Sequence, residues 1–427
     1  MKKIVLGALI LILVAAIAVA GFWWFSRPQI IILSNGTKLT LLGVTYGKHH
    51  VPPKITIAGK RIRSQARWDA TNDVGVVWVE AEYKPSNWPN FQLVISDKAG
   101  TGAVTSWSQT QYQVRNGVSV MGYILNAFPR RDSSMVLRVL AYGNNGQRLA
   151  KGQFTVSNPA HGPFPMWATV PLPDTESDGD LDVSLTNFSS DAKLPYRQYN
   201  GLAQNDPLNK AVQLGFDVEQ KGHPATNWQP VQVIMSDATG NQITGWINRN
   251  YQNGQSGYFC QSSLWPNEPD WKLRVEFSRS SGFNDDEVWT LTNLPVKQGT
   301  EQEANEFWNY RNEKKVTLAQ NTLSGIQVQA YPPIEYSNSY PGMNNGRNNK
   351  VVEIAFKADP DPDSAGMRMN VLKITDDQGH ELQSQGSGWG SGMYEYQFSV
   401  PRNTQSVNVT IALHKSRFVE FNVKPAK

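Results

Sequence analysis

The amino-acid sequence predicts an all-β protein of three tandem antiparallel β-sandwich units, of the Ig-like or Greek-key type, behind one N-terminal transmembrane helix. The first observation is a motif that occurs three times without a gap: WPNFQLVISDKAG at 88–100, WQPVQVIMSDATG at 228–240 and MRMNVLKITDDQG at 367–379. The copies begin 140 and then 139 residues apart, which indicates a tandem array. The other two observations are short strand-like segments between turn residues and one long apolar run at the N-terminus.

Each copy of the motif has the pattern of a strand that runs into a tight turn. Apolar residues hold alternate positions, as in a strand with one buried face, and the Asp-x-x-Gly that follows fits a type I turn in which the aspartate accepts a backbone hydrogen bond. The glycine then supplies the positive φ with which the chain reverses. The turn residues are Asp97, Asp237 and Asp376, with Gly100, Gly240 and Gly379. A catalytic or metal-binding role for the aspartates is the alternative, but the turn already requires them.

The N-terminus predicts the compartment. Lys2 and Lys3 precede an uninterrupted apolar run at residues 4–25, which at about 1.5 Å per residue spans a hydrocarbon layer of roughly 30 Å. The lysines favour a cytoplasmic N-terminus, so we expect residues 1–27 to form a single-pass anchor in a bacterial membrane, with the bulk of the chain periplasmic or extracellular. A signal sequence that is cleaved after Ala20 is the alternative.

The three units are expected at residues 30–159, 166–296 and 305–427. Each contains about seven to nine short strands between turns, without the helices that connect the strands of a parallel sheet, as in an antiparallel sandwich. We expect each unit to close on a strand that precedes a proline, because a strand end needs no ladder donor there. These closing segments are FTVSNP at 154–159, WTLTNLP at 289–295 and FNVKP at 421–425.

Each unit also opens in the same way. Asn35 and Gly36 stand between two apolar runs, a strong short-range signal for a β-hairpin. The pairs Asp178-Gly179 and Ser324-Gly325 hold the matching positions in the next two units. We therefore expect a hairpin turn at all three places.

The opening of the first unit carries a family resemblance. The segment NGTKLTLLGVTYG at 35–47, behind one N-terminal span, and the segment SGFNDDEVWTL at 281–291 resemble uncharacterised, membrane-anchored β-rich repeat proteins of environmental bacteria. The resemblance covers most of the chain and implies the architecture. It implies no activity.

Composition excludes several classes of function. The chain has 427 residues, 18% of them charged, and a formal net charge of +4 without a basic run, so we expect no nucleic-acid partner. The single cysteine, Cys260, excludes an internal disulfide framework and a thiolate metal cage. We expect Cys260 to be a small buried apolar residue.

We predict no catalytic residues, because the sequence contains no nucleophile elbow, phosphate loop or dinucleotide fingerprint. Paired carboxylates for glycoside cleavage stay open, since such pairs have no local signature. Aromatic residues are the richest feature, and most of the tryptophans should pack in the core. Tryptophans next to turn residues are the candidate ligand-binding residues, because they can present flat faces to a glycan or a protein: Trp88, Trp228, Trp265 and Trp389.

Two acidic clusters are candidate calcium sites. Asp359, Asp361 and Asp363 lie in a proline-stiffened loop, and three carboxylates in five residues can supply oxygen ligands to Ca²⁺. A solvated loop without metal is the favoured interpretation. The cluster at 174–182 resembles the start of a calcium loop, but Leu185 stands where a bidentate glutamate is needed. Apart from calcium, we expect no cofactor.

The function we expect is that of a non-enzymatic envelope protein. Residues 4–25 would hold the array at the membrane, and the units would act in binding, adhesion or as a scaffold for a glycan or protein partner. A glycan-active or glycan-binding enzyme, with carboxylates in a sandwich cleft, is one alternative. An accessory subunit of a surface-assembly or export complex is another. Exposed tryptophans and carboxylates in one cleft would favour the enzyme, whereas long exposed strand edges would favour subunit assembly.

Overall fold

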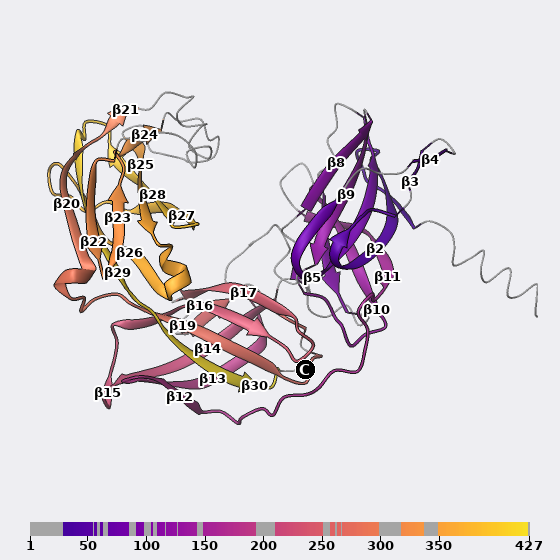
Figure 1. The fold of residues 1–427 in the computed structure, drawn as a ribbon, viewed down its shortest axis with the longest axis horizontal. Coiled ribbons are helices and arrows are strands. Elements are labelled where there is room, and N and C mark those ends of the chain that lie inside the picture. The colour runs from indigo at the N-terminus through magenta and orange to yellow at the C-terminus, as the bar shows by residue number, and fades with distance from the viewer. Residues whose placement is uncertain are drawn as a thin grey trace, which may run out of the picture.

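The protein is all-β, with several antiparallel sheets (Figure 1). The computed structural model describes residues 29–425 apart from 54, 58–59, 63–66, 85–90, 98–103, 106–108, 116, 126, 143–147, 194–209, 251–256, 261–262, 266, 299–316 and 337–348. The predicted anchor at 1–27 lies outside these residues and stays a prediction. Among the residues described, no helix is long and apolar enough to cross a membrane.

The first strand group comprises two sheets. In the first sheet the order is β1 (Ile30–Ile32), β2 (Lys38–His50), β5 (Trp68–Glu82), β9 (Val118–Leu125) and β8 (Gln109–Arg115). In the second sheet the order is β11 (Arg148–Ser157), β10 (Ser134–Tyr142), β6 (Phe91–Ser96) and β7 (Val104–Thr105). A small hairpin pairs β3 (Ile55–Ile57) with β4 (Lys60–Ile62). Apolar residues from both larger sheets contribute to one core.

The second strand group is continuous through β17, which pairs with β16 along one half and with β18 along the other. Its strands in order are β12 (Asp174–Asp178), β13 (Leu181–Lys193), β14 (Lys210–Gln220), β18 (Gly257–Cys260), β17 (Gln242–Asn250), β16 (Trp228–Ser236), β19 (Trp271–Arg279) and β30 (Arg417–Val423), with β15 (His223–Pro224) beside β14.

The third strand group again has two sheets. The smaller contains β20 (Val288–Pro295), β29 (Ser406–Lys415) and β26 (Met367–Asp376). The larger contains β21 (Lys297–Gln298), β24 (Ile334–Tyr336), β25 (Asn349–Asp359), β23 (Ile326–Ala330) and β22 (Ala319–Leu323), with β28 (Met393–Pro401) on β25 and β27 (Ser384–Gly390) on β28. Two short 3₁₀ helices are described, η2 (Asp285–Glu287) and η4 (Pro362–Ala365).

The closing strands of the second and third groups are exchanged. In the first group β11 pairs with the preceding strand, β10. In the second group the strand after β19 is β20, but β19 pairs with β30, and β20 pairs with β29 of the third group. Figure 1 shows β30 crossing from the third group into the second. The predicted boundaries at 166–296 and 305–427 stay a prediction, and the pairing places β30 beside β19 and β20 beside β29.

The exchange makes the third group an insertion in the second. Its strands run continuously from β20 to β29, and these two strands lie side by side, with Val288 opposite Ala412. A segment whose two ends are adjacent can be inserted between two strands of another domain without disturbing either. The insertion occurs between β19 and β30.

The predicted hairpin turns that fall within the described residues are confirmed. The opening glycines have positive φ angles of 81° at Gly36, 67° at Gly179 and 83° at Gly325, and the flanking strands pair as hairpins. In the repeated motif, Asp237 Oδ1 accepts hydrogen bonds from the backbone N–H groups of Thr239 and Asn241 at 2.9 and 3.2 Å. Asp376 makes the corresponding bonds to residues 378 and 380 at 2.9 and 2.8 Å. The turn after Asp97 lies outside the described residues.

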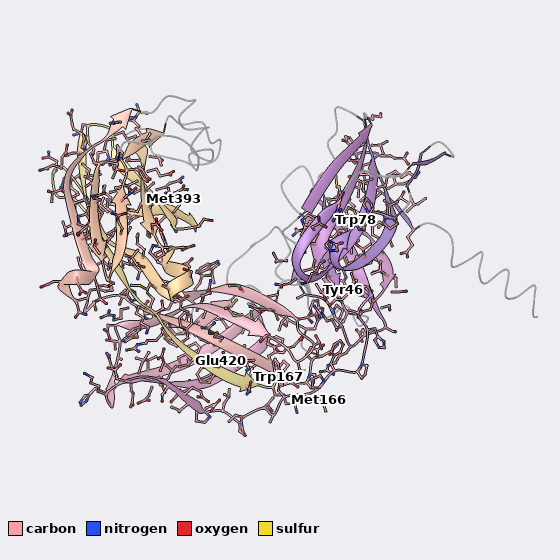
Figure 2. The ribbon with its side chains drawn as sticks, viewed as in Figure 1. Tyr46, Trp78, Met166, Trp167, Met393 and Glu420 are labelled. Carbon is pink, nitrogen blue, oxygen red and sulfur yellow. The ribbon has the colours of Figure 1, made fainter. Side chains whose placement is uncertain are left out.

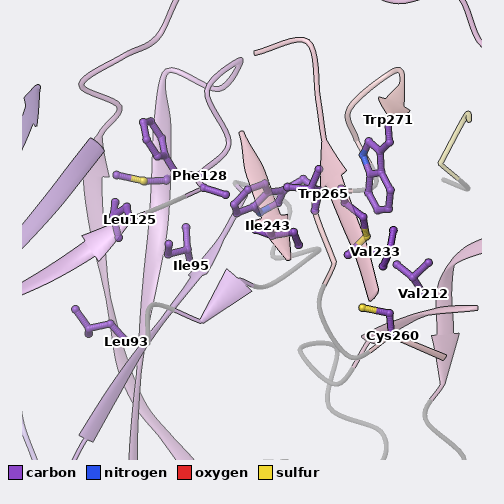
Figure 3. Close-up of a cluster of buried hydrophobic side chains, with 14 of the residues drawn as sticks. Leu93, Ile95, Leu125, Phe128, Val212, Val233, Ile243, Cys260, Trp265 and Trp271 are labelled. Atoms are coloured by element: carbon purple, nitrogen blue, oxygen red, sulfur yellow. The ribbon is translucent and has the colours of Figure 1, made fainter. Parts of the chain in front are cut away.

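The apolar cores distinguish the groups. One cluster of buried residues is continuous from the first group into the second, and the main core of the third group is a separate cluster. Figure 3 shows Trp265 and Ile243 between Phe128 of the first group and Trp271 of the second. Cys260 is fully buried in this continuous core, as expected for a small apolar residue.

Candidate functional site

A cleft lies where the second and third strand groups meet. Its volume is about 490 Å³, within the range of about 300–1,000 Å³ that is common for ligand sites. The start of β16 and the end of β19 form one wall, and β26, β28 and the segment after β26 form the other. Charged and apolar side chains are mixed on its surface. The charged and phenolic groups include Arg279, Asp363, Arg368, Lys373, Tyr394 and Tyr396.

A buried ion pair holds the two groups together beside this cleft. Glu276 on β19 accepts two hydrogen bonds from Arg368 on β26, from Nε at 2.8 Å and from Nη2 at 2.7 Å. Burial alone would lower the pKa of Arg368, but the bonds to Glu276 raise it, so the guanidinium stays charged. The hydroxyl of Ser416, between β29 and β30, donates to the same carboxylate at 2.6 Å. The bidentate geometry and the hydroxyl together offset the cost of burying the two charges.

Aromatic side chains cover a second ion pair, between Arg279 and Glu287. The guanidinium carbon of Arg279 lies 5.5 Å from the ring centroid of Trp228 and 5.3 Å from that of Phe283. His414 on β29 packs against the same two rings, with centroids 6.3 and 5.2 Å away. Burial lowers the pKa of His414, so its imidazole is neutral at neutral pH.

Two tyrosines of β28 border the cleft as hydrogen-bond donors. The Tyr394 hydroxyl donates to Asp363 Oδ1 at 3.3 Å, and the Tyr396 hydroxyl donates to the carbonyl of Met369 at 3.2 Å. Burial raises the pKa of both phenols, so they stay protonated. Burial and the nearby charge of Asp361 raise the pKa of Asp363 as well.

The junction between the first and second groups is closed by different contacts. Asn241 donates through Nδ2 to the carbonyl of Phe128 at 2.8 Å and accepts from its N–H at 3.1 Å. Arg131 Nε lies 2.7 Å from Glu268 Oε2. Burial and the nearby charge of Asp237 raise the pKa of Glu268 to about 7, against the lowering effect of Arg131. The segment that joins the two groups carries Met166 and Trp167 past the end of β30 (Figure 2).

Two of the predicted aromatic ligand residues, Trp228 and Trp265, are buried. Trp228 and Trp265 are only 5% and 1% exposed, so the expectation that they present open faces is wrong. The reason is that each packs at a junction between groups, Trp228 under Arg279 and Trp265 in the continuous core. Trp88 lies outside the described residues, and Trp389 belongs to β27 but its side chain is not described.

The three aspartates of the predicted calcium loop have other roles in the structure. Asp359 ends β25, and Asp361 caps η4 by accepting a hydrogen bond from the N–H of Asp363 at 3.2 Å. Asp363 faces Tyr394. Within the described part of the chain, no group of three or more His, Cys, Asp or Glu side chains is placed to hold a metal ion. Calcium binding there gains no support from the geometry.

The acidic cluster at 174–182 forms the hairpin of β12 and β13, as its alignment with the Asn35-Gly36 turn predicts. The carboxylates of this cluster bind residues of the exchanged strand β30. Arg417 of β30 lies 3.5 Å from Asp178 and 3.2 Å from Asp180, and the backbone N–H of Phe418 donates to Asp178 at 2.9 Å.

Sequence reasoning missed the residues that hold the junction together. Glu276 holds a polar position in the alternating strand β19, WKLRVEFSR, where a solvent-facing residue is expected, so the sequence carries no sign that its carboxylate is buried. The partner, Arg368, has no local signal, because it is distant in the chain. Trp246 was also missed as a surface residue: it is 39% exposed, and Arg368 lies over its ring at 5.3 Å.

Comparisons with known proteins add little. No model of a known protein family matches the chain, and no curated protein matches it. Among solved structures, the crystal structure of the conserved domain protein from Bacillus anthracis is similar at 12% sequence identity, over 62% of this chain and 82% of that chain, with a TM-score of 0.18. A TM-score this low does not establish a common fold.

Proposed function

We propose that the protein is a single-pass, membrane-anchored array of three β-sandwich units that acts outside the cytoplasmic membrane in binding, adhesion or as a scaffold. The apolar run at 4–25, the tandem motif and the all-β architecture support this proposal. The ligand is a glycan or a polypeptide of the envelope. The groups sit on one chain, so a partner bound to one is held near the others.

The observation that carries the proposal is the cleft between the second and third groups. The exchanged strands and the Glu276–Arg368 ion pair fix its two walls relative to each other. A pre-organised cleft loses less conformational entropy on binding than one that must close around its ligand. The mixed charged, phenolic and apolar lining suits a polar ligand with apolar groups.

Two alternatives remain for the same cleft. A glycan-active enzyme needs two carboxyl groups roughly 5–10 Å apart on either side of the scissile bond. Asp363, with its raised pKa, and Glu381 are the two carboxyl groups that line the cleft. An accessory subunit of a surface-assembly complex is the other alternative, and the edge strand β26 beside the cleft favours it.

A photo-crosslinking residue at position 373 tests the proposal. Lys373 is exposed and lines the cleft, whereas Glu219 is exposed on β14 of the second group and provides the control position. In cells that produce the full chain, we expect a discrete adduct from position 373 and none from 219. Adducts of equal yield at both positions, or at neither, would contradict a binding cleft. Glycan hydrolysis by the purified chain that Asp363→Asn abolishes would replace binding by catalysis.

The anchor requires its own measurement. The intact mass of the protein in the membrane fraction should include residues 1–27. A mature N-terminus at Gly21 would show that the segment is a cleaved signal sequence.

A further inference from the structure

One strand position that is filled in the first two groups is only partly filled by the described residues of the third. In the first group β7 pairs with β6, with Val94 opposite Thr105. In the second group β17 pairs with β16 over five positions, from Gln232–Trp246 to Ser236–Gln242. The motif alignment makes β26 the equivalent of β6 and β16, and β26 pairs with only one described strand, β29.

The chain does not fill this position in the third group because it turns away early. After the turn at Asp376, it makes one isolated bridge between Thr375 and Glu381, and Leu382 donates to the carbonyl of Ile374 at 2.9 Å. The next strand, β27, pairs with β28 of the other sheet. Residues 367–373 of β26 therefore keep an edge without a strand partner among the described residues.

This edge borders the cleft. Residues 368–374 of β26 all line it, together with Leu382 and Ser384 from the segment that turns away. An unpaired edge presents a row of backbone N–H and C=O groups at the spacing that another strand requires, and proteins usually cover or interrupt such edges. Here the side chains of Arg368 and Asn370 contact β19, which holds β26 in place, and the Tyr396 hydroxyl donates to the carbonyl of Met369.

We propose that an extended polypeptide segment of a partner adds to β26 as a strand along residues 367–373, next to Glu381 and Leu382, which already pair with Thr375 and Ile374. The inference rests on the proposed function of the cleft as a binding site and names its ligand class. Backbone hydrogen bonds supply the affinity, and side chains at alternate positions supply the specificity.

Charge at one position specifies the partner further. Lys373 corresponds to Ile234 of the second group, which lies opposite Thr244 of β17. The ammonium of Lys373 is exposed, whereas the two arginines of the cleft are already paired with Glu276 and Glu287. The partner segment therefore carries an acidic residue where β17 has Thr244.

Synthetic peptides with the full-length, detergent-solubilised protein test this inference. The probe has the sequence of residues 244–250 with glutamate in place of Thr244, and the matched control has lysine there. We expect fluorescence anisotropy to show binding of the glutamate peptide and roughly three- to fivefold weaker binding of the lysine peptide, the scale of an exposed ion pair. The Lys373→Glu variant should reverse this preference.

N-methylation distinguishes strand addition from other modes of binding. Methyl groups on the peptide nitrogens that face β26 remove backbone donors and should weaken binding roughly fivefold for each bond lost, whereas methyl groups on the alternate nitrogens should not. Those amides of residues 367–373 that do not already bond to β29 should become protected from hydrogen exchange. Equal effects of the two methylation patterns, or no binding, would overturn strand addition.

The proposed function and this inference fail in different ways. If no peptide binds but position 373 still yields its discrete adduct, the cleft binds a ligand of another class. If the protein alone dimerises and Lys373→Glu prevents it, the occupant is a second copy of this chain, and the partner segment is excluded. If neither position 373 nor any peptide gives a signal, both proposals fail.

Discussion

The two junctions of the molecule are built in different ways. Between the first and second groups, β11 returns to its own sheet, and side chains around Phe128, Ile243 and Trp265 make one continuous core. Between the second and third groups, β20 and β30 cross in opposite directions, while the two cores stay separate. The first junction depends on side-chain packing, and the second depends on backbone pairing.

The length of the connection between two strands explains the difference. Segment 143–147, between β10 and β11, has the sequence GNNGQ, whose glycines and asparagines favour a hairpin. Only Ser416 separates β29 from β30, and hairpin loops commonly need at least two residues. The chain therefore continues away from β29 into the second group. Once β30 occupies the edge of β19, β20 must pair elsewhere.

The largest expected losses of stability come from truncating a core side chain on an exchanged strand. Phe421 on β30 is fully buried in the core of the second group, and Leu291 on β20 is 6% exposed in the core of the third. We expect Phe421→Ala to destabilise the second group by about 3–5 kcal/mol and Leu291→Ala to destabilise the third by about 2–5 kcal/mol. Hydrogen exchange resolved by segment measures which strands lose protection.

If the closing strands were not exchanged, each substitution would destabilise the other group. Loss of protection in β26 and β29 on Phe421→Ala, and in β16 and β19 on Leu291→Ala, would show that each unit keeps its own closing strand. The two variants can be compared directly, because each replaces a large buried apolar side chain with alanine and only the group that loses protection should differ.

Removal of the ion pair at the exchanged junction should have the next largest effect on stability. Glu276→Ala leaves the buried guanidinium of Arg368 and the Ser416 hydroxyl without their acceptor. We expect a loss of about 3–5 kcal/mol in the free energy of unfolding, measured by denaturant titration. Glu420→Ala on β30 removes an exposed carboxylate, 51% exposed and paired with Lys272, and should cost less than about 1 kcal/mol. Similar losses for both variants would show that Glu276 has no special role.

Sequence reasoning identified the local structure better than the pairing. The glycine turns at Gly36, Gly179 and Gly325 and the aspartate turns at Asp237 and Asp376 depend on neighbouring residues, so the pattern specifies them. The closing segments at 289–295 and 421–425 resemble each other, and an apolar alternating pattern identifies a strand but not the sheet edge it joins. The absence of glycine and proline between 407 and 421 was the available signal for the exchange.

The candidate site could be predicted from the sequence less well than the local structure. Trp228 and Trp265 lie next to turns, and turns at the end of one group are the places where another group packs, so these rings are buried at junctions. The cleft combines residues of β16, β19 and β26, which are far apart in sequence. Among the described residues β26 pairs with one strand where β6 and β16 each pair with two, which becomes evident only when the three motif strands are compared.

The first junction should respond to pH. The pKa of Glu268 is raised from 4.5 to about 7 in the folded protein, so between these values the folded state keeps a proton that the unfolded state has released. The free energy of unfolding therefore falls as pH rises from about 4.5 to 7, by up to about 3 kcal/mol. Glu268→Gln stays neutral and should lose this part of the pH dependence. Parallel stability profiles of the two proteins from pH 5 to 8 would contradict the shift.

The smallest expected loss of stability is that of an Asp361 variant. It distinguishes a loop that only forms a turn from one that binds a metal ion. Asp361 caps η4, and loss of such a cap typically costs about 1 kcal/mol, so Asp361→Ala should reduce the free energy of unfolding by that amount. Asp359→Ala is the matched control, since Asp359 lies at the exposed end of β25 and caps no helix. If the loop only forms a turn, millimolar Ca²⁺ leaves both losses unchanged. If the three carboxylates bind Ca²⁺, the ion stabilises the parent protein, both variants lose that gain, and calorimetry of the parent shows heat that Asp361→Ala abolishes.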